Sequence, residues 1–222
     1  MSRPAVTTAV DAVAQELRAA VLAGEPPPGE RLREEALAAR YEVARHTVRA
    51  ALRLLAAERL VVIEPHRGAR VARLDGAELA ALFELRTALE VEAFHLFVER
   101  GRGACGAGES REPGELRWPD AVHAAADELD RRCRADPPDR AAVDAAHLAL
   151  HHALVAAAGS PRITQAHAAL AAEQGLALRQ SRATLPVERM AHHHRDLLRE
   201  LSREGPDALR RHLDVGRTLS SG

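Results

Sequence analysis

The strongest constraint in this sequence is a pair of short helical patterns separated by a tight turn. The first covers residues 33–41 and the second residues 45–59, and apolar residues recur at helical spacing in both. A β-branched stretch follows at residues 60–64, and after a turn the chain returns as a second predicted strand at residues 69–71. This order predicts a helix-turn-helix with a β-hairpin wing, in which the second helix can enter the major groove of DNA.

A local excess of arginine supports this prediction. The whole chain carries 31 basic and 32 acidic residues, but eight arginines face three acids between Arg40 and Arg73. Arg45, Arg49 and Arg53 recur every four residues, so they form one stripe of the second helix. A basic patch on a neutral protein indicates a polyanionic partner, and a solvated helix face is the alternative interpretation.

Between residues 21 and 74, a series of short motifs follows one another in an order that is typical of one protein family. Their residues are Gly24, Pro28, Gly29, Arg31, Leu32, Glu34, Leu37, Ala38, Val43, Arg45, Thr47, Val48, Arg49, Ala51, Leu52, Leu60, Val61, Arg67, Gly68 and Val71. In this order they resemble the winged helix of the GntR-family bacterial transcription regulators. Ala44 stands where this family usually has a serine that caps the recognition helix, and Arg59 stands where glycine is usual. Without the cap hydroxyl, the helix is expected to lose about 1 kcal/mol of stabilisation.

The resemblance implies where this part of the chain contacts DNA. The first turns of a recognition helix face base edges, and an arginine there can bind guanine O6 and N7 bidentately. The wing tip is expected to reach the flanking minor groove, and Arg33 is expected to hold a phosphate. The candidate DNA-contacting residues are Arg33, Arg45, His46, Thr47, Arg49, His66, Arg67 and Gly68.

The expected fold class is mainly α: a winged helix-turn-helix with a small β-hairpin wing over residues 1–74, and an all-α bundle over residues 75–222. Helices of the bundle are predicted over residues 79–99, 121–134, 140–158, 163–181, 186–204 and 207–218. A flexible loop is expected over residues 101–120, which are rich in Gly, Glu, Arg and Pro. In the first helix, Leu85 and the other apolar side chains are expected to pack inwards, and Arg86 and Glu90 to face solvent.

Ten of the 12 histidines follow residue 75, and they cluster. His147 and His151 are four residues apart in a predicted helix, so both imidazoles project from one face and can share a metal ion. One such pair by itself is also compatible with ordinary core or surface histidines.

Five motifs of the C-terminal half resemble the FCD ligand-binding domain of the FadR-type branch of the same family. They are residues 82–90, 147–151, 157–161, 194–198 and 211–213. The resemblance implies a divalent metal, often zinc, held by His147, His151, His194 and His212. His147 stands where aspartate is usual, and the step from His194 to His212 is about one helical turn shorter than usual.

The charge of this candidate site predicts the kind of effector. Four neutral imidazoles leave the 2+ charge of the ion uncompensated, which favours an anion such as a carboxylate at an open coordination position. Arg86 is expected to bind the other end of the effector bidentately. Asp144 is a candidate outer partner or alternative ligand. A metal-free pocket that keeps the histidines is the alternative.

We expect a DNA-binding transcription regulator that dimerises through its helical domain, binds a double-stranded operator and responds to a small carboxylate. The alternatives are a constitutive DNA-binding dimer with a degenerate effector pocket and a histidine-ligated metalloenzyme. The sequence contains no H-E-x-x-H motif that would support a metalloenzyme, so we expect no enzymatic activity. The chain lacks a signal-peptide pattern and an apolar run of about 18 residues, so a cytoplasmic protein without a membrane partner is expected. The effector, the operator, the target genes and the sign of regulation do not follow from the sequence.

Overall fold

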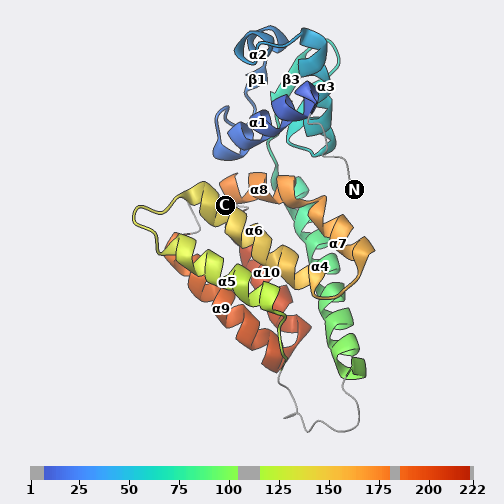
Figure 1. Cartoon of the computed structure of the whole chain (residues 1–222), viewed down its shortest axis with the longest axis vertical. Coiled ribbons are helices and arrows are strands. Elements are labelled where there is room, and N and C mark those ends of the chain that lie inside the picture. Colours follow the sequence, from blue (N-terminus) through green and yellow to red (C-terminus); the bar gives the residue numbers. More distant parts are fainter. Residues whose placement is uncertain (1–7, 105–115, 181–185, 221–222) are drawn as a thin grey trace, which may run out of the picture. The chain divides into compact units, whose positions relative to one another are not determined.

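The computed structural model describes residues 8–104, 116–180 and 186–220, and it divides into two compact units, Met1–Leu74 and Asp75–Gly222 (Figure 1). The elements of the first unit are α1 (Ala9–Ala23), β1 (Arg31–Leu32), α2 (Glu34–Arg40), α3 (Arg45–Ala57), β2 (Val61–Glu64) and β3 (Gly68–Val71). Those of the second unit are α4 (Gly76–Ala104), α5 (Asp120–Cys133), α6 (Arg140–Ala156), α7 (Pro161–Ala168), α8 (Ala171–Gln180), α9 (Val187–Glu204) and α10 (Pro206–Ser220). The predicted fold class is confirmed.

Local sequence signals fix both ends of α1. The Thr8 hydroxyl accepts a hydrogen bond from the Asp11 backbone N–H at 3.1 Å, and the Asp11 carboxylate accepts one from the Thr8 backbone N–H at 3.2 Å. These reciprocal bonds form a capping box. The helix ends at Gly24, whose φ of 97° is left-handed and costs glycine no steric strain. Leu17 of α1 is fully buried, and α1 packs against α3.

A sheet of three strands, rather than the predicted two-stranded hairpin, forms the wing. The strand order is β1-β3-β2, and both pairs are antiparallel. Arg70 of β3 is paired with Arg31 on one side and with Val62 on the other. The third strand was missed because β1 is only two residues long and has no alternating pattern of its own; its pairing with a distant strand defines it.

The start of the recognition helix α3 lacks the side-chain cap, as expected. Ala44 occupies the N-cap with extended backbone angles, φ −68° and ψ 149°, and makes no side-chain hydrogen bond. These angles already suit a capping serine. We therefore expect Ala44→Ser to raise the free energy of unfolding by about 1 kcal/mol. Urea unfolding followed by circular dichroism checks this, with Ala39→Ser on the exposed side of α2 as a control; no gain, or an equal gain in the control, contradicts it.

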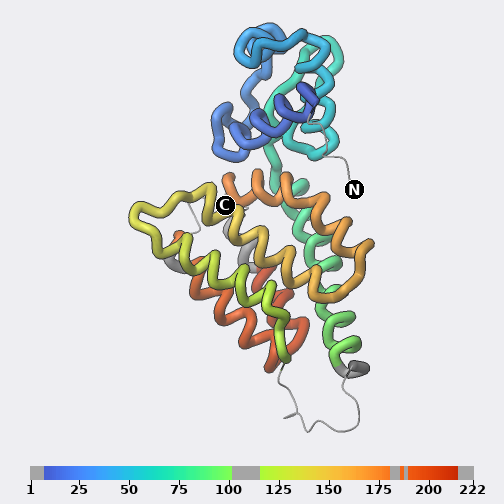
Figure 2. Tube along the Cα trace, in the orientation of Figure 1, coloured from blue at the N-terminus to red at the C-terminus, as the bar shows by residue number. Residues whose placement is uncertain are grey.

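The second unit is a helical bundle in which α5 lies against α6 and α9 (Figure 2). Its core includes Phe94, Val122, Leu150, Met190 and Leu213, which come from five different helices. No helix among the described residues has both the length and the hydropathy to cross a membrane.

Two predictions about the helices of this unit are wrong in detail. The single helix predicted over residues 163–181 is broken into α7 and α8, where the Leu170 N–H bonds to the His167 carbonyl at 3.0 Å in a tighter turn. No Gly or Pro marks this break, so periodicity could not reveal it. The loop predicted over residues 101–120 does not hold at either end of that range: α4 continues to Ala104, and Trp118 is buried against Phe97. Residues 105–115 lie outside the described residues.

Leu82 and Phe94 of α4 are buried as predicted, but three other side chains of this helix are not placed as expected. Leu85 was predicted to pack inwards but is 50% exposed, whereas Arg86 and Glu90 were predicted to face solvent but are buried. Arg86 and Glu90 lie on the same side of α4 as the buried Phe83 and Phe94. A buried carboxylate needs partners inside the bundle, and Arg86, His151 and His167 provide them for Glu90.

Candidate metal centre and nucleic-acid interface

Four histidines from three helices of the second unit meet inside the bundle. His147 and His151 come from α6, His194 from α9 and His212 from α10. One ring nitrogen of each lies within 4.8 Å of those of the other three. The first three side chains are buried and the fourth is half-buried. The shorter step before His212 therefore does not prevent its ring from joining the cluster, because α9 and α10 pack side by side.

Outer hydrogen bonds fix the tautomers of two of these rings. His151 Nδ1 lies 2.8 Å from the Glu90 carboxylate, and His194 Nδ1 lies 2.7 Å from the Met190 carbonyl oxygen. Both partners are acceptors, so each Nδ1 carries the proton and donates it. Both Nε2 atoms are then unprotonated, and they face each other at 3.2 Å. Two nitrogens bound to one zinc ion at about 2.0–2.1 Å with tetrahedral angles lie about 3.3–3.4 Å apart. The spacing fits a shared metal ion.

Protonation of one ring, with the proton shared between His151 Nε2 and His194 Nε2, is unfavourable in this buried cluster. Burial lowers the pKa of His151 to about 4, helped by the nearby Arg86 charge and opposed by Glu90. Burial also lowers the pKa of His194 to about 3. The pKa of His147 and of His212 is shifted in the same direction, again mainly by burial. At neutral pH all four rings are therefore neutral, which is the form that binds metals.

Glu90 links this cluster to α4 and α7. Its carboxylate lies 2.5 Å from Arg86 Nε, 2.8 Å from His151 Nδ1 and 3.3 Å from His167 Nε2. Burial acts to raise the pKa of the Glu90 carboxyl, but Arg86, His151 and His167 together hold it well below its usual value. An ionised carboxylate on a ligating histidine orients the ring and increases its basicity.

Sequence reasoning missed Glu90 and His167 as parts of this site. The available signal for Glu90 was its place on the apolar stripe of α4, four residues after Arg86. Asp144, the suggested outer partner or alternative ligand, is not in the cluster; its carboxylate lies 3.0 Å from Arg140 Nε. Arg86 has a buried donor that is available to a ligand: among the described residues, its Nη2 has no hydrogen-bond partner.

In the first unit, seven of the eight candidate DNA-contacting residues are exposed. They are Arg33, Arg45, His46, Arg49, His66, Arg67 and Gly68. Thr47 is buried instead. It precedes Val48 on the side of α3 that faces the core, so it is far less accessible than the other seven candidates.

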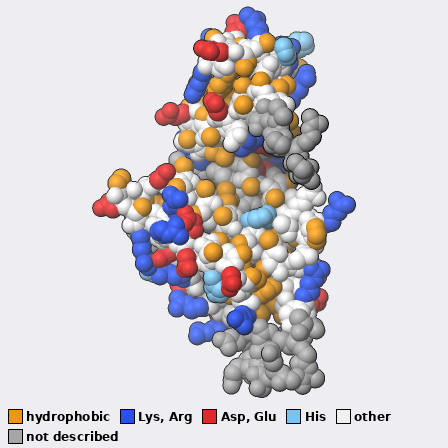
Figure 3. All heavy atoms as spheres, viewed as in Figure 1, with side chains coloured by type: hydrophobic (Ala, Val, Ile, Leu, Met, Phe, Trp, Pro, Cys, Tyr) orange, Lys and Arg blue, Asp and Glu red, His pale blue; other side chains and the backbone are white. Residues whose placement is uncertain are grey.

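Acidic side chains of α2 form ion pairs with arginines of the recognition helix α3. Arg49 binds Glu34 through two hydrogen bonds, Nε to Oε1 at 3.0 Å and Nη2 to Oε2 at 2.7 Å. Arg45 Nη1 lies 2.9 Å from Glu35 Oε1. The hydrogen bonds from Arg49 lower the pKa of the Glu34 carboxyl, although burial acts in the opposite direction. Acidic and arginine side chains are interspersed on the visible face of this unit (Figure 3). The basic patch is therefore more neutral than its sequence suggests.

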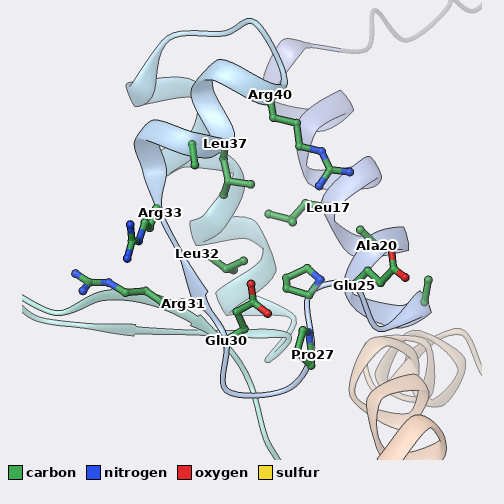
Figure 4. A pocket seen from close by; sticks show the side chains of 13 residues that line it. Leu17, Ala20, Glu25, Pro27, Glu30, Arg31, Leu32, Arg33, Leu37 and Arg40 are labelled. Atoms are coloured by element: carbon green, nitrogen blue, oxygen red, sulfur yellow. The ribbon is translucent and has the colours of Figure 1, made fainter.

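A groove of about 810 Å³ lies between α1, α2 and β1. Leu32 points towards Leu17 at its floor, whereas Arg31 and Arg33 point away from it (Figure 4). This alternation follows from the extended backbone of β1. The two arginines therefore share an exposed side.

Two family models match the chain in sequence order. Residues 9–71 match the model described as bacterial regulatory proteins of the gntR family, and residues 114–215 match the FCD domain. An uncharacterized HTH-type transcriptional regulator, BphR of Paraburkholderia xenovorans, is 40% identical over 43% of this chain and 39% of that protein. The transcriptional repressor GlaR of Escherichia coli is 31% identical over 65% of this chain and 61% of that protein. The matches thus span less than two thirds of each of these relatives.

A solved structure shows the same fold. A GntR transcriptional regulator of Rhodococcus aligns with a TM-score of 0.72 and 24% identity, covering 95% of this chain and 96% of that one. The winged helix and the helical bundle agree with the order of the two matched domains. The chain therefore belongs to the GntR family of bacterial transcriptional regulators, with an N-terminal winged helix and a C-terminal FCD domain.

Proposed function

We propose that the histidine cluster holds a divalent metal, zinc, and that a small carboxylate bound there controls the affinity of the winged helix for its DNA operator. The observation that carries this proposal is the pair of unprotonated Nε2 atoms of His151 and His194, 3.2 Å apart in a buried site. Such lone pairs repel each other unless a cation lies between them. His147 and His212 would complete the ligand set.

The charges around the cluster favour an anionic effector. The four imidazoles are neutral, and the charges of Glu90 and Arg86 cancel each other. A bound ion would keep its 2+ charge, which a carboxylate neutralises by coordination. Arg86 Nη2, buried and without a partner among the described residues, supplies a donor for another oxygen of the same ligand.

DNA binding would use the exposed arginines of the recognition helix and the wing. Arg45 and Arg49 are proposed to contact base edges, Arg33 a phosphate, and the wing tip at Arg67 the flanking minor groove. We propose a homodimer, which would place two winged helices on a pseudo-palindromic site.

The experiment begins with selection of duplexes from a random pool by the full-length protein. Fluorescence anisotropy then compares the selected duplex with a scrambled one at fixed salt. It uses metal-stripped and zinc-loaded protein and a panel of hydroxy-, oxo- and dicarboxylates. We expect selective binding, and a change in Kd of about 5–150-fold with at least one carboxylate, in the zinc-loaded protein only.

The same data separate the alternatives. Selective binding that no carboxylate changes would favour the constitutive DNA-binding dimer. A response that is equal with and without zinc would refute the metal-dependent effector site. Absence of selectivity for the selected duplex would refute operator recognition itself.

A further inference from the structure

The pair formed by Arg49 and Glu34 leaves the arginine able to read a base. Glu34 occupies the Nε–H and one Nη2–H of the guanidinium. A guanidinium has five N–H groups, so both hydrogens of Nη1 and one of Nη2 remain. The remaining Nη2 hydrogen and one hydrogen of Nη1 form the end-on edge of the guanidinium, which can donate bidentately to guanine O6 and N7.

The same pair restricts where that edge can point. Glu34 is the first residue of α2 and α2 packs against α3, so its carboxylate is held by a neighbouring helix. Its side chain is only 32% exposed, against 56% for Arg49. A long arginine side chain that is fixed before DNA binds loses little further rotamer freedom on binding. Preorganisation of this kind increases discrimination between bases, since a rigid fork cannot adapt to the wrong one.

The other arginine of the helix is held differently. Arg45 makes a single contact to Glu35, and these side chains are 64% and 73% exposed. One exposed contact restricts a side chain far less than a two-point fork does. The structure therefore distinguishes a fixed arginine, Arg49, from an adaptable one, Arg45.

We propose that Glu34 is a positioning residue for DNA specificity, which holds the Arg49 guanidinium so that its Nη1 and Nη2 edge meets one base pair. This inference rests on the proposed contact between Arg49 and DNA. Glu34 itself touches no base. Its carboxylate repels phosphates, so its presence on a DNA-facing surface opposes binding of DNA in general while it sharpens the choice of sequence.

The loss of charge and the loss of positioning at residue 34 have opposite effects on DNA binding, so one substitution can distinguish them. Glu34→Gln removes a negative charge, so simple electrostatics predicts equal or tighter binding to every duplex. The positioning role instead predicts that the ratio of affinities for the selected and the scrambled duplex falls by about tenfold, within the roughly 5–150-fold that a bidentate arginine–guanine pair contributes. Anisotropy titrations of both duplexes measure this ratio.

Two further variants separate geometry from charge. Glu34→Asp keeps the charge but shortens the side chain, and it is expected to lower the ratio as well. Glu30→Gln removes one negative charge from an exposed residue that makes no ion pair within the described part of the chain, and it is expected to leave the ratio unchanged. Adding Glu34→Gln to Arg49→Ala should cause no further loss of selectivity, because the two residues act as one unit.

The outcomes distinguish this inference from the proposed function. If the parent protein discriminates between the duplexes and Glu34→Gln and Glu34→Asp discriminate equally well, the positioning role is wrong and the proposed function stands. If the parent protein does not discriminate, operator recognition fails and the inference fails with it. Thermal unfolding of each variant checks that the ratio is measured on folded protein.

Discussion

The His151→Ala variant is expected to lose zinc binding by at least about 100-fold. Loss of an outer partner alone costs metal sites about 10–100-fold in affinity, and His151 is a proposed ligand at the centre of the cluster. Its ring is fully buried and contacts both Glu90 and His194. Titration of zinc into the metal-stripped protein, followed by elemental analysis after gel filtration, measures the loss.

Stability gives a second readout of the same variant. Zinc at about 100 times its Kd should stabilise the parent protein by about 2.7 kcal/mol, and it should not stabilise the variant. Without metal, the variant should still be less stable than the parent by about 1–3 kcal/mol, because the buried Glu90 carboxylate loses a hydrogen-bond donor. His123→Ala, which changes an exposed histidine of α5, is the control and should bind zinc normally. Equal zinc content in His151→Ala and the parent would rule out the proposed site.

The Arg49→Ala variant is expected to lose selective DNA binding. A bidentate contact to guanine contributes about 1–3 kcal/mol of discrimination, so the affinity for the selected duplex should fall by at least tenfold towards that for the scrambled one. The slope of log Kd against log salt concentration should change by no more than about 1, which corresponds to the loss of one phosphate contact. Anisotropy at several salt concentrations measures both quantities.

Arg49→Lys is the informative control for this variant. Lysine keeps the positive charge but lacks the planar fork, so it should bind scrambled DNA like the parent while losing selectivity. If Arg49→Ala keeps the parent's affinity for the selected duplex, the placement of the recognition helix on DNA is refuted. If Arg49→Lys restores full selectivity, charge rather than geometry explains the contact.

Much of the winged helix was predictable because its signals are local. Helical spacing, the turn before Val43 and the β-branched stretch at Val61 each act within a few residues, and the motif order added the family resemblance. The histidines that meet in the bundle were also predictable in identity, from the spacing of His147 and His151 and from the FCD resemblance. Their surroundings were not predictable in this way.

The sequence by itself determined the order of helix-turn-helix, wing and helical bundle, the absence of a cap hydroxyl at Ala44 and the presence of the four histidines of the cluster. Tertiary structure alone decided which side of α4 faces inwards, and so buried Arg86 and Glu90 beside the histidines. It also brought Glu34 onto Arg49 across 15 residues of chain. The physical reason is the same in both cases: a charged side chain reveals its partner only when packing brings distant helices together, and burial then decides whether that pair is solvated or held in a fixed geometry.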